Sequence, residues 1–109
     1  MAQVIKQYDT ILLRWQLSVS LTDTTEVRFI MNPKTRPEMP VVEKVVSIDP
    51  IDDTVVLVTL DSSETAVPGR YNVEFETTWN DGQIITFPAK GYERLTILPD
   101  LGGVVEESS

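Results

Sequence analysis

The sequence predicts an all-β domain, folded as an immunoglobulin-like β-sandwich of about seven antiparallel strands. Three observations lead to this fold class. Apolar and polar residues alternate with a period of two in several segments, as in strands that bury one face. These segments are short and are separated by turn residues at intervals typical of sandwiches. Every proline lies between two expected strands or at the end of one: Pro33, Pro37, Pro40, Pro50, Pro68, Pro88 and Pro99.

The segment 70–79 shows the clearest alternation. Every second residue from Tyr71 to Trp79 falls on one side of an extended chain, and all the large apolar residues are on that side. A helix would scatter the same residues around its circumference. We therefore expect a strand with one buried face.

The other expected strands are rich in β-branched and apolar residues and span 11–19, 27–31, 41–48, 54–60, 83–87 and 93–98. Asn80-Asp81-Gly82 is a hairpin signal between two of them. The segment 49–53 predicts another hairpin or tight loop. The segment 61–69 predicts a crossover with one helical turn at 62–65. With no cysteine to form a disulfide between the sheets, aromatic residues should fill the core: Trp15, Trp79, Phe29, Phe75, Phe87, Tyr71 and Tyr92.

Residues 1–100 are expected to form one domain, because 109 residues are the usual size of a single domain. The segment 101–109 combines two glycines, two valines and an acidic, polar end, which predicts a flexible C-terminal tail or arm. We expect no signal peptide at the N-terminus, because Met1 to Lys6 lacks a charged region followed by an apolar stretch.

Composition argues against most chemical functions. The chain contains no histidine and no cysteine, so the commonest general base, the commonest transition-metal ligands and a thiol nucleophile are missing. We therefore expect no enzyme, no catalytic residues, no cofactor and no bound metal. A net charge of −8 disfavours nucleic acid as a partner. No apolar run approaches the roughly 18 residues that span a bilayer, so no membrane partner is expected.

Two acidic clusters have alternative interpretations. Asp49, Asp52 and Asp53 could supply oxygen ligands to a hard cation, but aspartates also favour and cap turns, which we prefer. Asp61 and Glu64 have the Asp-x-x-Glu spacing of an N-capped turn, which suits them better than a pair of catalytic carboxylates.

Two other features invite an interpretation. We interpret Tyr92 as a core or corner tyrosine whose hydroxyl bonds to backbone, in preference to a ligand contact. Lys34-Thr35-Arg36, between prolines, could form an interaction loop.

Several short motifs together resemble a known family, most specifically between positions 68 and 101. They are Asp9-Thr10, Leu21-Thr22, Val27-Arg28-Phe29, Asp52-Asp53, Pro68-Gly69-Arg70-Tyr71, Val73-Glu74-Phe75-Glu76, Asp81-Gly82, Thr86-Phe87-Pro88, Gly91-Tyr92 and Asp100-Leu101-Gly102-Gly103. In this order they resemble the small phage proteins related to the N-terminal domain of the baseplate upper protein of tailed phages. The family often carries a Leu-Thr-Gly-Ala turn, from which Leu21-Thr22-Asp23-Thr24 departs.

The resemblance implies an immunoglobulin-like sandwich with a structural or adaptor role in a virion. The implied partners are other virion structural proteins of the capsid, neck or tail, with multiple copies in a symmetric assembly. The implied location is the virion, after synthesis in the host cytoplasm. The alternative is a module that binds glycan or protein on a host surface. Under the structural reading, the chain ends are the expected contacts, through Leu101, Val104, Val105, Val4 and Ile5.

Overall fold

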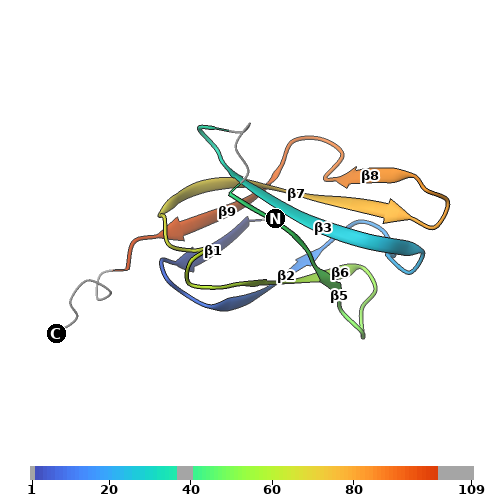
Figure 1. The fold of residues 1–109 in the computed structure, drawn as a ribbon, viewed down its shortest axis with the longest axis horizontal. Helices are drawn as coiled ribbons and strands as arrows, with labels where there is room; N and C mark the ends of the chain where they lie inside the picture. Colours follow the sequence, from blue (N-terminus) through green and yellow to red (C-terminus); the bar gives the residue numbers. More distant parts are fainter. Residues whose placement is uncertain (1, 37–40, 101–109) are drawn as a thin grey trace.

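The protein is described here by a computed structural model that covers residues 2–36 and 41–100. Over these residues the chain forms two β-sheets that pack face to face (Figure 1). The immunoglobulin-like β-sandwich expected from the alternation is therefore confirmed. No helix in the described part is long and apolar enough to cross a membrane.

The larger sheet is built around the long strand β7. Across the sheet the order is β1 (Ala2–Lys6), β9 (Glu93–Leu98), β7 (Gly69–Trp79), β3 (Thr24–Pro33) and β4 (Val42–Val45). β8 (Ile84–Phe87) pairs with the C-terminal half of β7, and β9 pairs with its N-terminal half. The smaller sheet has the order β2 (Ile11–Gln16), β6 (Val55–Leu60) and β5 (Ser47–Ile48).

Three aromatic rings form the centre of the core. Phe29 on β3 and Phe75 on β7 are direct cross-strand neighbours, with ring centroids 5.7 Å apart. Trp15 on β2 meets them from the smaller sheet at centroid distances of 5.8 and 5.5 Å. All three side chains are fully buried. Tilted and edge-on contacts of this kind add to the free energy gained from burial.

The segment 41–48 forms two strands where the sequence predicts one. β4 pairs with β3 in the larger sheet, whereas β5 pairs with β6 in the smaller one. The chain changes sheets at Val46, whose N–H donates to the carbonyl of Val27 and whose side chain packs against the core. Uniform β-branched composition gives no sign of this change, because either sheet accepts such residues.

The N-terminal segment forms a strand that the sequence analysis missed. β1 runs parallel to β9, with Ile5 opposite Ile97, so the described strands include one parallel pair besides the antiparallel ones. Ile5 is 4% exposed and belongs to the core, whereas its neighbour Val4 is 62% exposed. The segment is therefore part of the sheet and not a free arm.

The prediction of the corner tyrosine named the wrong residue. Tyr92 is 49% exposed, and the hydroxyl of the buried Tyr71 instead donates to the carbonyl of Val67 at 2.6 Å. Tyr71 lies near the start of β7, and this bond four residues back closes the corner between the two sheets. Burial raises the pKa of Tyr71 above its ordinary value.

Two of the expected turns are confirmed. Asn80-Asp81-Gly82 joins β7 to β8, with Gly82 at a positive φ of 88° and its N–H donating to the carbonyl of Trp79. Residues 49–53 join the antiparallel strands β5 and β6.

Candidate functional site: the open edge beside β8

The aspartates of the β5–β6 turn are held by contacts within the turn and with residues near it. Asp49 is 6% exposed; it accepts the N–H of Ile51 at 2.9 Å and pairs with Arg14. Asp52 accepts both the N–H and the hydroxyl of Thr54, at 3.0 and 2.6 Å. These contacts satisfy the carboxylates locally, as the turn interpretation expects.

The third aspartate of this turn is held by the loop between β2 and β3. One oxygen of Asp53 accepts the hydroxyls of Ser20 and Thr22, each at 2.8 Å. Among residues 2–36 and 41–100, no group of three or more His, Cys, Asp or Glu side chains is arranged to hold a metal ion.

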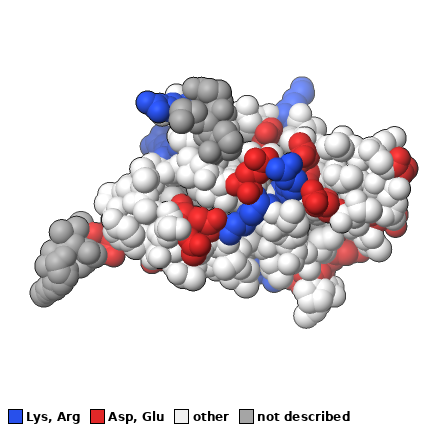
Figure 2. Space-filling model, viewed as in Figure 1, with Lys and Arg blue, Asp and Glu red and all other residues white. Residues whose placement is uncertain are grey.

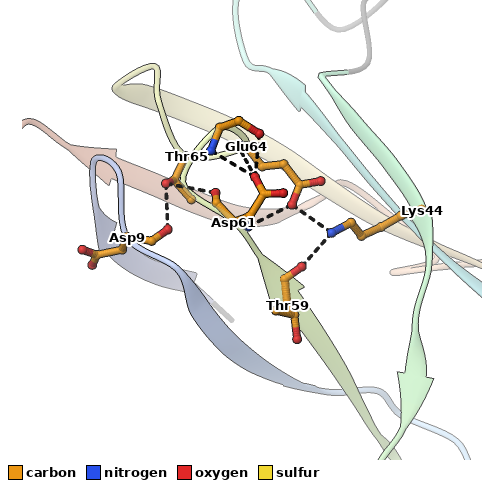
Figure 3. A network of polar contacts seen from close by, with 7 residues as sticks. Asp9, Lys44, Thr59, Asp61, Glu64 and Thr65 are labelled. Carbon is orange, nitrogen blue, oxygen red and sulfur yellow. Dashed lines mark hydrogen bonds and ion pairs between the residues drawn. The ribbon is translucent and has the colours of Figure 1, made fainter.

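Asp61 and Glu64 form the reciprocal cap that their spacing predicts. The N–H of Glu64 donates to Asp61 Oδ1 at 2.9 Å, and the N–H of Asp61 donates to Glu64 Oε1 at 3.0 Å. Lys44 on β4 reaches the same Glu64 oxygen at 2.8 Å and the carbonyl of Thr59 at 2.7 Å (Figure 3). Both carboxylates are thus occupied in closing the turn and tying β4 to it.

The turn is also tied to the start of the chain. The buried hydroxyl of Thr65 lies 2.8 Å from the carbonyl of Asp9, to which it can donate (Figure 3). The acidic clusters are therefore structural, and their chemistry appears in the pH dependence of stability.

We expect the protein to lose stability in acid. The pKa of Asp49 lies below its ordinary value of 3.8 because of its hydrogen bond from Ile51 and its pairing with Arg14. The pKa of Asp61 is lowered by Ser63 and by the N–H of Glu64. As pH falls, the unfolded chain binds protons at these carboxylates before the folded protein does. The stabilisation is therefore present above the ordinary pKa and is lost as pH falls through the lower pKa of the folded protein.

Urea unfolding at a series of pH values, followed by circular dichroism, measures this loss. Asp61→Asn should flatten the dependence below pH 4. Asp23→Asn is the matched control, because the Asp23 carboxylate makes no hydrogen bond or ion pair among the described residues. Equal slopes for Asp61→Asn and the unmodified chain would contradict the assignment.

One basic residue on the outer face of the larger sheet is neutralised by acidic neighbours. Arg28 on β3 contacts Glu43 on β4 and Glu76 on β7. Figure 2 shows basic and acidic side chains directly beside one another in the middle of one face. Partly exposed pairs of this kind contribute little stability each, and around Arg28 the opposite charges offset one another.

The outer edge of β8 is different. β8 pairs with β7 on one side, and no described strand pairs with it on the other. The N–H of Trp79 donates to the carbonyl of Gln83 at 2.9 Å. Residues that hydrogen-bond to the partner strand alternate with residues that do not along an antiparallel pair. The backbone N–H and C=O groups of Ile84 and Thr86 therefore point away from β7. β8 therefore offers two N–H and two C=O groups along an open edge.

The side chains of β8 are apolar and accessible. Ile84 is 62% exposed and Ile85 is 41% exposed. Ile85 lies opposite the buried Thr77 and so points to the side of the sheet that faces the smaller sheet. Its exposure shows that the three strands of the smaller sheet do not cover this position.

A small cleft continues from β8 toward the smaller sheet. It has a volume of about 150 Å³ and lies between the end of β2 and the residues that follow β8. Its lining is Gln16, Leu17, Ser18, Phe87, Pro88 and Glu93. The edge of β8 with its two isoleucines and this cleft together are called the edge site below.

β8 is held firmly in place by its partner strand. The Thr77 hydroxyl donates to the carbonyl of Ile85 at 2.7 Å, and the indole N–H of Trp79 donates to the Thr77 hydroxyl at 2.8 Å. Phe87 packs against the core. The edge is consequently preformed.

β8 also lacks the protection that the other edges have. Proteins discourage strand addition with charged residues on edge strands or with very short edge strands. β1, β2 and β4 carry Lys6, Arg14 and the pair Glu43 and Lys44, and β5 has two residues. Among the described edge strands of four or more residues, β8 alone has no charged residue.

The expected contact residues lie elsewhere. Val4 is exposed on β1, Ile5 is buried in the core, and Leu101, Val104 and Val105 lie outside the described residues. Sequence reasoning missed the edge site because it used Ile84 and Ile85 only to define a strand. An uncharged apolar pair at the end of a hairpin was the available signal.

Comparison with known proteins identifies the fold but no sequence family. No family model matches the chain, and no curated protein matches it. Among solved structures, CopC from Methylosinus trichosporium OB3b matches over 91% of this chain and 86% of its own, with a TM-score of 0.59. The chain has the fold of CopC. At 16% identity, the likeness to CopC concerns the fold alone.

The comparison corrects the family expected from the sequence. The resemblance to the phage baseplate family was wrong, because the match is to CopC and no phage family model matches. The virion role that this family implied and the alternative of a host-surface binding module are therefore wrong as well. The motifs misled because pieces such as Asp81-Gly82 and Pro68-Gly69 are turn chemistry that many sandwiches need.

Proposed function

We propose that this protein is a non-enzymatic binding domain that accepts an extended polypeptide as an additional strand beside β8. The observation that carries the proposal is that β8 is a preformed, uncharged and apolar edge. Strand addition uses main-chain hydrogen bonds for affinity and alternate side chains for specificity. The edge site supplies both, through the outward backbone of Ile84 and Thr86 and the side chain of Ile85.

The comparison with CopC, a copper resistance protein, raises copper binding as an alternative function to strand addition. Copper sites use imidazole, thiolate and thioether ligands. This chain has no histidine and no cysteine, and Met31 is fully buried in the core. The donor set of the described residues does not fit copper, so we propose no copper role.

The chemistry of the edge site indicates its partner. Exposed isoleucines on a free edge favour a segment with apolar or β-branched residues at alternate positions. A net charge of −8 favours a neutral or basic segment over an acidic one, and makes nucleic acid an unsuitable partner.

Selection from a library of short unconstrained peptides tests the proposal. Peptides that bind the protein should contain alternating apolar residues and should slow the hydrogen exchange of the Ile84 and Thr86 amides. Ile84→Lys should weaken their binding roughly ten-fold, about 1.4 kcal/mol, because a charged side chain on an edge strand opposes strand addition.

The matched control is Val45→Lys. Val45 is also 62% exposed and also lies on an edge strand, β4, so it reproduces the change in charge and exposure away from β8. Binding should survive this substitution. Equal loss of binding in both variants, or unchanged exchange at Ile84 and Thr86, would count against the edge site.

A further inference from the structure

A groove lies at the opposite end of β7 from β8. It lies beside the end of β3 and the start of β7 and has a volume of about 630 Å³. Its lining residues are Pro33, Lys34, Thr35, Val67, Pro68, Gly69, Arg70 and Tyr71. We call it the terminal groove. It includes two residues of the Lys34-Thr35-Arg36 loop, which the edge site does not use.

The terminal groove has fixed walls with an apolar surface. The N–H of Lys34 donates to the carbonyl of Arg70 at 2.9 Å, which joins one wall to the other. The Tyr71 hydroxyl holds the carbonyl of Val67, whose side chain is 64% exposed. Pro33 and Pro68 complete the apolar lining.

Two cations stand at this apolar lining. Lys34 and Arg70 are both exposed, and neither forms an ion pair among the described residues. Arg14, Arg28 and Lys44, by contrast, are paired with carboxylates. In a chain of net charge −8, an apolar groove with two cations that no described carboxylate pairs favours a ligand that is both apolar and acidic.

The C-terminal segment of the same chain has this chemistry and begins close by. Residues 104–107 read Val-Val-Glu-Glu. The N–H of Asp100 donates to the side chain of Gln7 at 3.3 Å, and Gln7 donates to the carbonyl of Ala66 at 2.8 Å. Ala66 immediately precedes Val67 in the wall of the terminal groove. The Gln7 side chain therefore connects Asp100, the last described residue, to this wall.

The length of the segment is sufficient. Nine residues follow Asp100 and span up to about 30 Å when extended, at about 3.3 Å per residue. Gly102 and Gly103 permit the chain to turn before the valines. A short tether also gives an effective concentration in the millimolar range, which favours the chain's own segment over that of a second copy.

We propose that residues 104–107 of the C-terminal segment dock in the terminal groove of the same chain, with the valines on its apolar lining and the glutamates beside Lys34 and Arg70. This contact is independent of the edge site. It makes the C-terminus an internal ligand of the sandwich, in place of the contact arm predicted from the sequence.

Paramagnetic relaxation in the full-length chain tests the docking. The chain has no cysteine, so Ser108→Cys provides one site for a nitroxide label. In dilute protein the label should broaden the amide signals of Lys34, Thr35 and Arg70 and leave those of β8 sharp. The broadening should weaken in 1 M salt, where charges are screened beyond about 3 Å.

An exchange of charges provides the control. Glu106→Lys with Glu107→Lys should abolish the broadening at the terminal groove, and the further changes Lys34→Glu and Arg70→Glu should restore it. Failure to restore it, or no broadening in the unmodified labelled chain, would overturn the proposal.

A mixture of ¹⁵N protein without the nitroxide and ¹⁴N protein that carries the nitroxide shows whether the contact forms within one chain or between two copies. Broadening in that mixture equal to that within one chain would assign the groove to a second copy and overturn the intramolecular contact.

Discussion

Trp15→Ala should lower the free energy of unfolding by about 3–5 kcal/mol, the range measured for large-to-small changes at buried aromatic positions. Trp15 has no exposed surface and contacts both Phe29 and Phe75. Removing it empties the space between the two sheets. Domains of this size are stable by about 5–15 kcal/mol in total, so the loss would be a large share.

Leu12→Ala is the matched control for this prediction. Leu12 lies on the same strand, β2, but is 56% exposed, so its truncation should cost about 0.5 kcal/mol or less. Urea unfolding followed by circular dichroism measures both variants, because fluorescence would lose one of the two tryptophans. Similar losses in the two variants would show that Trp15 is not the centre of the core.

Trp15→Phe separates packing from polarity at the same position. The indole N–H of Trp15 is buried and has no hydrogen-bond partner among the described residues. An unpaired buried donor costs about 1–3 kcal/mol, and phenylalanine removes that cost while keeping most of the ring. We therefore expect Trp15→Phe to be much less destabilising than Trp15→Ala.

The elements that the sequence predicted well are those with alternation along one buried face. β7 and β9 match the expected segments within one residue, because their side chains alternate between core and solvent. The Asp61 and Glu64 cap was predictable for a similar reason, since both partners lie within one turn. Local patterns determine local structure.

The elements that failed depend on contacts far along the chain. The division of 41–48 between two sheets is decided by pairing with β3 and β6, not by its own residues. Tyr71 replaced Tyr92 as the corner residue because Val67 lies within reach of its hydroxyl. The edge site was hidden for the same reason: the exposure of Ile85 follows from the width of the opposing sheet.

Ile5→Ala should cost about 2–4 kcal/mol, because truncating a buried isoleucine loses transfer free energy and leaves a cavity. Ile5 is 4% exposed and lies opposite Ile97 in the parallel pair of β1 and β9. Val4→Ala is the matched control; Val4 is the neighbouring residue, is 62% exposed and should change stability by no more than about 0.5 kcal/mol. Urea unfolding of both variants decides between the two roles considered for this segment. A free N-terminal arm would make both substitutions equally harmless, whereas a strand that closes the sandwich requires the buried residue alone to matter.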